Sequence, residues 1–210
     1  MYQTIKVEKM DGIAKITLNR PQRLNAITLE LLDELRRALN ELEFDDDVRV
    51  VIITGEGKAF SAGLDLQAVS EGDLLKPSVS MLLAAKGQEV FTAIERFPKP
   101  VIAAINGYAF GGGCELALAC DFRIISKNAQ IGLTETALGL IPGWGGTQRM
   151  TKLIGMAKAK ELIMFAKRLN GEEAEKIGLA NKAVDPEKFW DLSLIHISEP
   201  TRPLYISYAV

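Results

Sequence analysis

Histidine is almost absent from this chain of 210 residues, which contains His196 alone. A Ser–His–Asp triad or a His-rich metal site therefore has very little to draw on. Cysteine is nearly as scarce, with Cys114 and Cys120 as the two examples. Six residues apart on a predicted helix, they face different directions, so we expect no disulfide between them. We interpret both as small apolar residues in a reducing compartment.

The chain has no large excess of charge of either sign and no long apolar run. The net charge is −2, from 25 Lys and Arg against 27 Asp and Glu, so we expect no basic face for nucleic acid. No apolar run reaches the roughly 20 residues of a membrane span. The first ten residues are polar and mixed in charge, unlike a signal peptide. The chain is therefore predicted to act in the cytoplasm, on neither nucleic acid nor membranes.

Apolar patterning predicts strands that alternate with helices. Two alternating stretches, "TIKVEK" and "IAKITLNRP", flank Asp11-Gly12 and predict a hairpin. The β-branched runs "VRVVIITG", "VIAAIN" and "FRIIS" predict buried strands. Helices are expected from the Thr28 cap to about Leu42, and over about residues 80–97, 157–166 and 172–177. This order is typical of an α/β layered fold with much parallel sheet.

The chain changes character near residue 192. The segment 192–210, "LSLIHISEPTRPLYISYAV", lacks helical periodicity and contains two prolines. We interpret it as a non-native tail, and His196 within it as a residue without a role. Residues 1–191 are then predicted to be the folded part, as one domain.

The stretch "NGYAFGGGCELALACD", residues 106–121, places three glycines directly before an apolar helical segment. Because glycine weakens the interior of a regular element, the triplet indicates a strand-to-helix turn. The first N–H groups of a helix lack intrahelical partners and carry partial positive charge. The triplet thus predicts an oxyanion hole for a carbonyl that gains charge.

Two acidic residues accompany this turn. Glu115 lies in the first helical turn, and Glu135 follows in "QIGLTETALGL" after one predicted strand. Two carboxylates near one polarised carbonyl could handle a water molecule and a proton, one as base and the other as acid. The residues alone leave a structural alternative open, in which Glu115 complements the helix dipole and Glu135 caps a helix.

Spacing excludes several other signatures. The triplet does not fit G-x-G-x-x-G, and "GWGGTQ" lacks the Gly-Lys-Ser/Thr of a phosphate loop. The sequence "AFSAG" is not G-x-S-x-G, so Ser61 is a poor candidate nucleophile. No metal-ligand spacing is present. We expect neither a metal nor a redox cofactor.

Four motifs together resemble the enoyl-CoA hydratase/isomerase (crotonase) family. They are "LNRPQRLNAI", "GEGKAFSAGLDL", "KPVIAAINGYAFGGGCELALACDFRI" and "GLTETALGLIPGWGGTQRM", in the order the family has them. The resemblance runs from the first strand to about Phe189. It implies a crotonase-like spiral of repeated strand–strand–helix turns. The family continues into several helices that cover the acyl end of the pocket, so the resemblance implies truncation of that part.

The resemblance also implies roles for individual residues. The N–H groups of Leu64 and Gly112 match the two donors that hold the thioester oxygen. Glu115 matches the acid that activates water for attack at C3, and Glu135 matches the acid that delivers the proton to C2. The groove for coenzyme A and substrate is implied to include Leu24, Ala26, Ala62, Gly63, Leu64, Asp65, Leu66, Gln67, Gly111 and Gly112.

The function that the resemblance implies is that of an enoyl-CoA hydratase in fatty acid β-oxidation. Such an enzyme adds water reversibly and syn to a 2-trans-enoyl-CoA, giving a 3-hydroxyacyl-CoA. The implied partner is the acyl-CoA thioester, and the implied assembly is a homotrimer or homohexamer. One alternative is an enoyl-CoA delta-isomerase or another enzyme of the family, and a second is a catalytically inactive acyl-CoA-binding protein. An isomerase needs one acid–base group, so the presence of both glutamates favours hydration.

Four further residues have structural expectations. Trp144 is expected either to form a wall of the acyl pocket or to pack within its loop. Asp65 and Asp121 are expected to cap or pair with the backbone. Arg149 is expected at the surface or at an interface.

Overall fold

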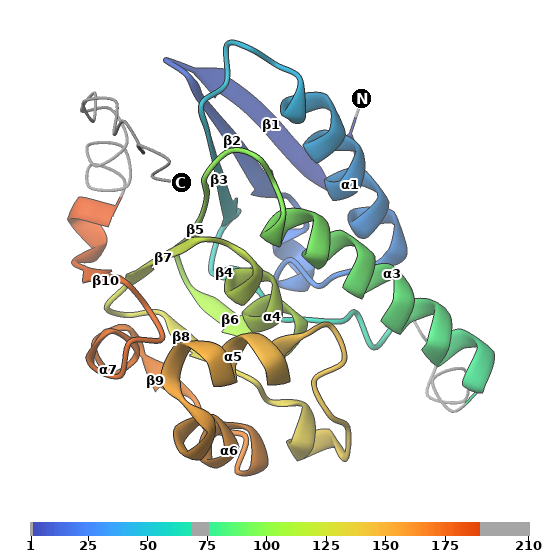
Figure 1. The fold of residues 1–210 in the computed structure, drawn as a ribbon, viewed down its shortest axis with the longest axis vertical. Coiled ribbons are helices and arrows are strands. Elements are labelled where there is room, and N and C mark those ends of the chain that lie inside the picture. The colour runs from blue at the N-terminus through green and yellow to red at the C-terminus, as the bar shows by residue number, and fades with distance from the viewer. Residues whose placement is uncertain (1, 69–75, 190–210) are drawn as a thin grey trace, which may run out of the picture.

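The computed structural model describes residues 2–68 and 76–189, in which two β-sheets are surrounded by helices (Figure 1). The larger sheet has six strands in the order β1 (Ile5–Met10), β2 (Ile13–Leu18), β3 (Val50–Gly55), β5 (Val101–Ile105), β7 (Phe122–Ser126) and β10 (Lys182–Val184). The smaller sheet has the order β4 (Ala59–Ser61), β6 (Tyr108–Phe110), β8 (Gln130–Gly132) and β9 (Leu169–Asn170). Strands pair in parallel except β1 with β2 and β8 with β9.

The chain visits the two sheets in turn. Strands β3 and β4 precede α3 (Pro77–Glu95), and β5 and β6 precede α4 (Gly112–Ala119). Strands β7 and β8 precede η2 (Glu135–Leu138), α5 (Gly146–Ile154) and α6 (Met156–Met164). After β9 come α7 (Gly171–Lys176), β10 and η3 (Pro186–Lys188). Each repeat of the spiral therefore consists of one strand in the large sheet, one strand in the small sheet and then a helix. This order confirms the predicted α/β spiral.

Local sequence signals explain the N-terminal elements. Asp11 and Gly12 join β1 to β2 and have positive φ angles of 53° and 83°, as a two-residue hairpin turn requires. A short helix, η1 (Pro21–Arg23), follows β2. Helix α1 (Leu29–Glu43) then begins after Thr28, whose side chain accepts a hydrogen bond from the N–H of Leu31 at 3.2 Å.

Helices α1 and α3 lie side by side against the large sheet (Figure 1). The face of α1 toward the core carries the predicted leucines, all of them buried: Leu31, Leu32, Leu35, Leu39 and Leu42. Helix α3 begins at Pro77, three residues before the expected start, because proline suits the first helical position. It ends at Glu95, before the two prolines that follow.

The central strands β3 and β5 are apolar on both faces of the large sheet, which is why their sequences are nearly continuously apolar. Ile16, Ile53 and Ala103 face the main core with the helices. Ile52 and Ile102 face a smaller cluster that includes Phe189. Helix α4 packs against β4 and β6 of the small sheet and against α3 and α5, and it is buried along its whole length, so an acid on this helix lies in the interior.

Several structural expectations are confirmed, and one is wrong. Cys114 and Cys120 are buried free thiols, and the Asp121 carboxylate accepts a hydrogen bond from the N–H of Val101 at 2.8 Å. The surface position expected for Arg149 is wrong, since its side chain is 8% exposed and its guanidinium forms an ion pair with Glu95; the alternative, an interface, stays a prediction. No helix in the described part of the chain is long and apolar enough to cross a membrane. The predicted tail, with His196, lies outside the described residues.

Candidate active site

The three glycines of the triplet meet three different requirements. Gly111 precedes α4 with a φ of 51°, a conformation that residues with side chains rarely adopt. A Cβ atom on Gly112 would lie 2.3 Å from Cζ3 of Trp144. A Cβ atom on Gly113 would lie 2.2 Å from a backbone oxygen of β4. The helix begins at Gly112, as the strand-to-helix turn predicts.

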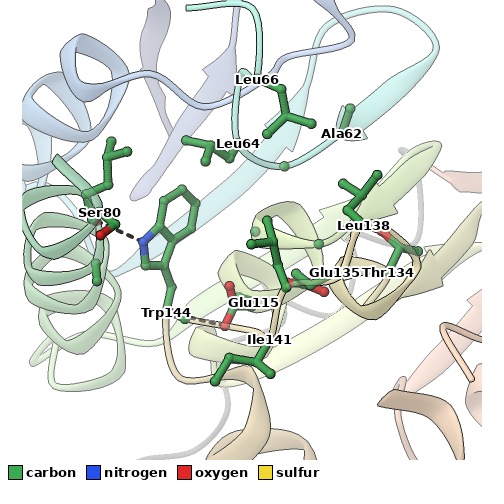
Figure 2. A pocket seen from close by; sticks show the side chains of 17 residues that line it. Ala62, Leu64, Leu66, Ser80, Glu115, Thr134, Glu135, Leu138, Ile141 and Trp144 are labelled. Carbon is green, nitrogen blue, oxygen red and sulfur yellow. Dashed lines mark hydrogen bonds between the residues drawn. The ribbon is translucent and has the colours of Figure 1, made fainter. Parts of the chain in front are cut away.

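Two main-chain N–H groups are available at one pocket. Leu64 and Gly112 both line a cavity of about 200 Å³, although they follow strands of different spiral turns (Figure 2). Among the described residues, neither N–H donates a hydrogen bond to another protein group. The two loops meet closely, because a Cβ on Gly63 would lie 3.0 Å from the nitrogen of Gly112. Paired free donors are what a site for a developing oxyanion needs.

Glu115 is held by backbone groups inside the pocket. Its side chain is 2% exposed, and its Oε1 accepts hydrogen bonds from the N–H groups of Trp144 and Gly146, each at 2.8 Å. Burial raises the pKa of the Glu115 carboxyl, while these two bonds and the charge of Arg149 oppose that rise. No described group donates to its Oε2, which leaves this oxygen available to a water molecule.

Glu135 has very different surroundings. It is the first residue of η2, and both of its carboxyl oxygens are buried without a hydrogen-bond partner in the described part of the chain. Burial, and then the charge of Glu115, raise the pKa of Glu135 to about 7. A carboxyl with this pKa can hold and release a proton near neutral pH, which suits general acid catalysis.

The two acids enter the pocket from different elements, α4 and η2, and an apolar wall surrounds them (Figure 2). Trp144 lines the cavity, and its ring packs against α3 and not within its own loop. Its indole Nε1 donates a hydrogen bond to the carbonyl of Leu83 at 2.9 Å, and the centroids of the indole and Phe91 rings lie 5.4 Å apart in a T-shaped arrangement. The remaining apolar lining includes Leu64, Leu66, Leu138, Leu140 and Ile141.

The residues proposed for the coenzyme A groove divide into two groups. Those that line the cavity are Ala62, Gly63, Leu64, Leu66, Gly111 and Gly112. The others, Leu24, Ala26, Asp65 and Gln67, do not line it. Asp65 forms an ion pair with Arg20 at 2.9 Å and accepts backbone N–H bonds from Gln67 and Ala68, which confirms its expected pairing with backbone. These contacts shape the loop that carries Leu64.

Sequence reasoning missed the contribution of α3 and α5 to the site. Ser80, Leu83 and Ala84 of α3 line the cavity, and the first N–H of α5 binds Glu115. The glycine-rich stretch "GWGGTQ" leads into α5. It carried no signal for the partner of that helix, because Glu115 and Gly146 are 31 residues apart in the chain.

Comparison with known proteins gives consistent matches. The family described as Enoyl-CoA hydratase/isomerase matches residues 8–199. The short-chain-enoyl-CoA hydratase of Clostridium acetobutylicum is 45% identical over 183 residues, which are 87% of this chain and 69% of that protein. The crotonyl-CoA hydratase of Syntrophomonas wolfei is 45% identical over 188 residues, covering 89% and 71%. The crystal structure of an enoyl-CoA hydratase from Bacillus anthracis superimposes with a TM-score of 0.87 at 43% identity, covering 93% and 75%.

Proposed function

This chain belongs to the enoyl-CoA hydratase/isomerase family, and we propose that it is an enoyl-CoA hydratase, a hydro-lyase. The proposed reaction is the reversible syn addition of water to a 2-trans-enoyl-CoA, which gives a 3-hydroxyacyl-CoA. The observation that carries the proposal is the pair of carboxyls in one pocket. Glu115 is held by two N–H groups, and Glu135 is unpaired with a pKa of about 7.

The thioester carbonyl binds at the two free main-chain donors. Its oxygen accepts hydrogen bonds from the N–H groups of Leu64 and Gly112. When water adds at C3, negative charge develops on this oxygen as the enolate forms. The N-terminus of α4 and the low-dielectric pocket then stabilise the charge more strongly than they stabilise the neutral substrate.

Glu115 acts as the general base. Its Oε1 is fixed by Trp144 and Gly146, so its Oε2 can accept a proton from the water that forms the new bond to C3. Holding the carboxylate and the water in one orientation supplies part of the rate acceleration.

Glu135 acts as the general acid. Its carboxyl proton passes to C2 of the enolate, and the C2–H bond forms while the negative charge returns from the thioester oxygen. Glu135 becomes ionised and Glu115 carries the proton taken from water, so the pocket keeps its proton count. Both acids line the same cavity, which supports addition of water and proton to one face of the substrate.

The setting forms part of the same proposal. We propose fatty acid β-oxidation in the cytoplasm, with the acyl-CoA thioester as the partner and with neither metal nor redox cofactor. We propose a homotrimer or homohexamer as the assembly. The exposed apolar side chains of Leu138 and Ile141 near the pocket support an assembly, because such side chains often mark protein contacts. Sedimentation velocity would measure the oligomeric state directly.

Hydration of crotonyl-CoA tests the function. We expect loss of the absorbance of the conjugated enoyl thioester on addition of the protein, and in D₂O we expect deuterium at C2 on the face that receives the hydroxyl. A 3-enoyl-CoA converted without any 3-hydroxyacyl product would indicate an isomerase instead. Tight binding of crotonyl-CoA without turnover would indicate an acyl-CoA-binding protein.

A further inference from the structure

The main chain of Trp144 is held on both sides of its Cα atom. Its N–H donates to Oε1 of Glu115 at 2.8 Å, and its carbonyl accepts a hydrogen bond from Nη1 of Arg149 at 2.8 Å. Arg149 belongs to α5 and is buried. The two bonds lie in adjacent peptide units joined at Cα of Trp144, so a displacement of the carbonyl shifts the neighbouring N–H that orients Glu115.

Arg149 is itself held in one orientation. Its Nη2 and Nε donate to a single oxygen of Glu95, at 2.7 Å and 3.1 Å. Glu95 is the last residue of α3, so the guanidinium links α3 to the loop before α5. The planar guanidinium is suited to this task because it can satisfy a carboxylate and a carbonyl at the same time, which a lysine ammonium does less well.

One stripe of α3 holds the rest of Trp144. Leu83, Gly87, Phe91 and Glu95 follow one another at four-residue spacing, so they lie on one face of the helix. The carbonyl of Leu83 accepts the indole N–H, and Phe91 meets the indole edge at an interplanar angle of 82°. A Cβ on Gly87 would lie 2.2 Å from the indole nitrogen, so only glycine leaves room for the ring there.

We infer that Arg149, oriented by Glu95, is a positioning residue for the general base: it fixes the main chain at Trp144 and so aims Glu115 at the attacking water. The role of Glu115 as a base depends on the proposed function, whereas the contacts from Glu95 through Arg149 and Trp144 to Glu115 do not. In the described residues, the charged groups that face Glu115 are Arg149 from α5, Glu135 from η2 and, behind Arg149, Glu95 from α3.

Kinetics of three variants separate charge from geometry. Arg149→Lys keeps the positive charge but loses the planar guanidinium that binds Glu95 and Trp144 together. Arg149→Gln loses both the charge and the guanidinium. We expect each to lower kcat by about 10- to 100-fold, the range for slight misplacement of a reacting group, with a much smaller change in KM. The acid limb of the pH profile should move to higher pH in Arg149→Gln alone, because the positive charge favours ionised Glu115. Glu95→Gln should lower kcat without moving that limb upward.

A matched control is Arg123→Gln. Arg123 is equally buried and donates to the carbonyls of Leu179 and Cys120, but it does not contact the Trp144 loop. We expect this variant to lower the Tm and to leave the pH profile in place. If Arg149→Gln also lost only Tm, with an unmoved acid limb and an unchanged kcat, the inference would be overturned.

A second readout does not depend on turnover. Carboxyl ¹³C NMR of protein labelled at glutamate can follow the titration of Glu115, with Glu115→Gln used to assign the signal. We expect the pKa of Glu115 to rise in Arg149→Gln and to stay in place in Arg149→Lys. If the protein did not act on crotonyl-CoA, the proposed function would be refuted. The titration of Glu115 would still test whether Arg149 positions this residue. Unchanged titration of Glu115 in Arg149→Gln would refute the inference alone.

Discussion

The charge of Glu115 adds to burial in raising the pKa of Glu135 to about 7, so the ionisation of one carboxyl in the pocket affects that of the other. Their difference comes from their surroundings. Two backbone N–H groups stabilise the ionised form of Glu115, whereas the oxygens of Glu135 have no partner among the described residues. Near neutral pH the pocket can therefore hold a base and an acid together.

Glu135 is expected to make stability depend on pH. Its folded-state pKa is raised above the unfolded value near 4.5, so its stabilising contribution is full below that pH and is lost as the pH rises through about 7. Glu135→Gln cannot ionise, so it should raise the Tm near pH 8 and leave it nearly unchanged near pH 4. The gain at the higher pH is at most about 3 kcal/mol, from ~2.5 pKa units at 1.36 kcal/mol each.

Glu161→Gln serves as the control for this measurement. Lys158 and Lys167 lower the pKa of Glu161 to about 2, so neutralising this exposed acid should give no gain near pH 8. Equal Tm values for wild type and Glu135→Gln at that pH would show that Glu135 ionises without penalty in the fold.

Removing either acid should reduce turnover. Glu115→Gln and Glu135→Gln are each expected to lower kcat for crotonyl-CoA hydration by roughly 10²- to 10⁴-fold, the usual loss for a positioned acid or base. Substrate binding should change much less, because both side chains keep their size. The comparison with Glu161→Gln controls for the loss of a carboxylate elsewhere. Near-full activity in either site variant would remove that residue from the mechanism.

Gly112 is expected to tolerate no side chain. In Gly112→Ala the new Cβ would lie 2.3 Å from Cζ3 of Trp144, so the ring or α4 must move. We expect a lower Tm, and a loss of about 10²- to 10³-fold in kcat as the N–H donor is misplaced. Adding Trp144→Leu should restore part of the Tm but not the turnover.

Gly143→Ala is the matched control for stability. No described atom lies within 4 Å of a Cβ built on Gly143, so this variant should keep the wild-type Tm. A Gly112→Ala protein with both wild-type Tm and wild-type kcat would show that the glycine serves neither the packing nor the oxyanion site.

The two thiols are expected to be inert in the native protein. Burial raises the pKa of Cys120 to about 12, and burial together with the charges of Glu135 and Glu115 raises the pKa of Cys114 strongly. Because the thiolate is the reactive form, a disulfide reagent near pH 8 should label neither cysteine until a denaturant is added. Stoichiometric labelling of the folded protein within minutes would contradict this.

Features that depend on near neighbours in the chain were predictable from the sequence. The Asp11-Gly12 turn, the Thr28 cap and the glycine turn before α4 each follow from conformations and hydrogen bonds within a few residues. The periodic leucines of α1 likewise define its buried face. The two candidate acids were identified because they stand beside such local signals.

The tertiary structure alone decided how the site works. Arg149 was expected at the surface or at an interface, yet the fold buries it against Glu95 of α3. The partners of Glu115, the contact of Trp144 with α3 and the raised pKa of Glu135 also come from segments far apart in the chain. Periodicity predicts which face of an element is buried, but the parallel spiral determines which distant element it meets. The packing of these distant elements determines the hydrogen-bond partners and the burial of each acid, because both depend on distances that local sequence does not encode.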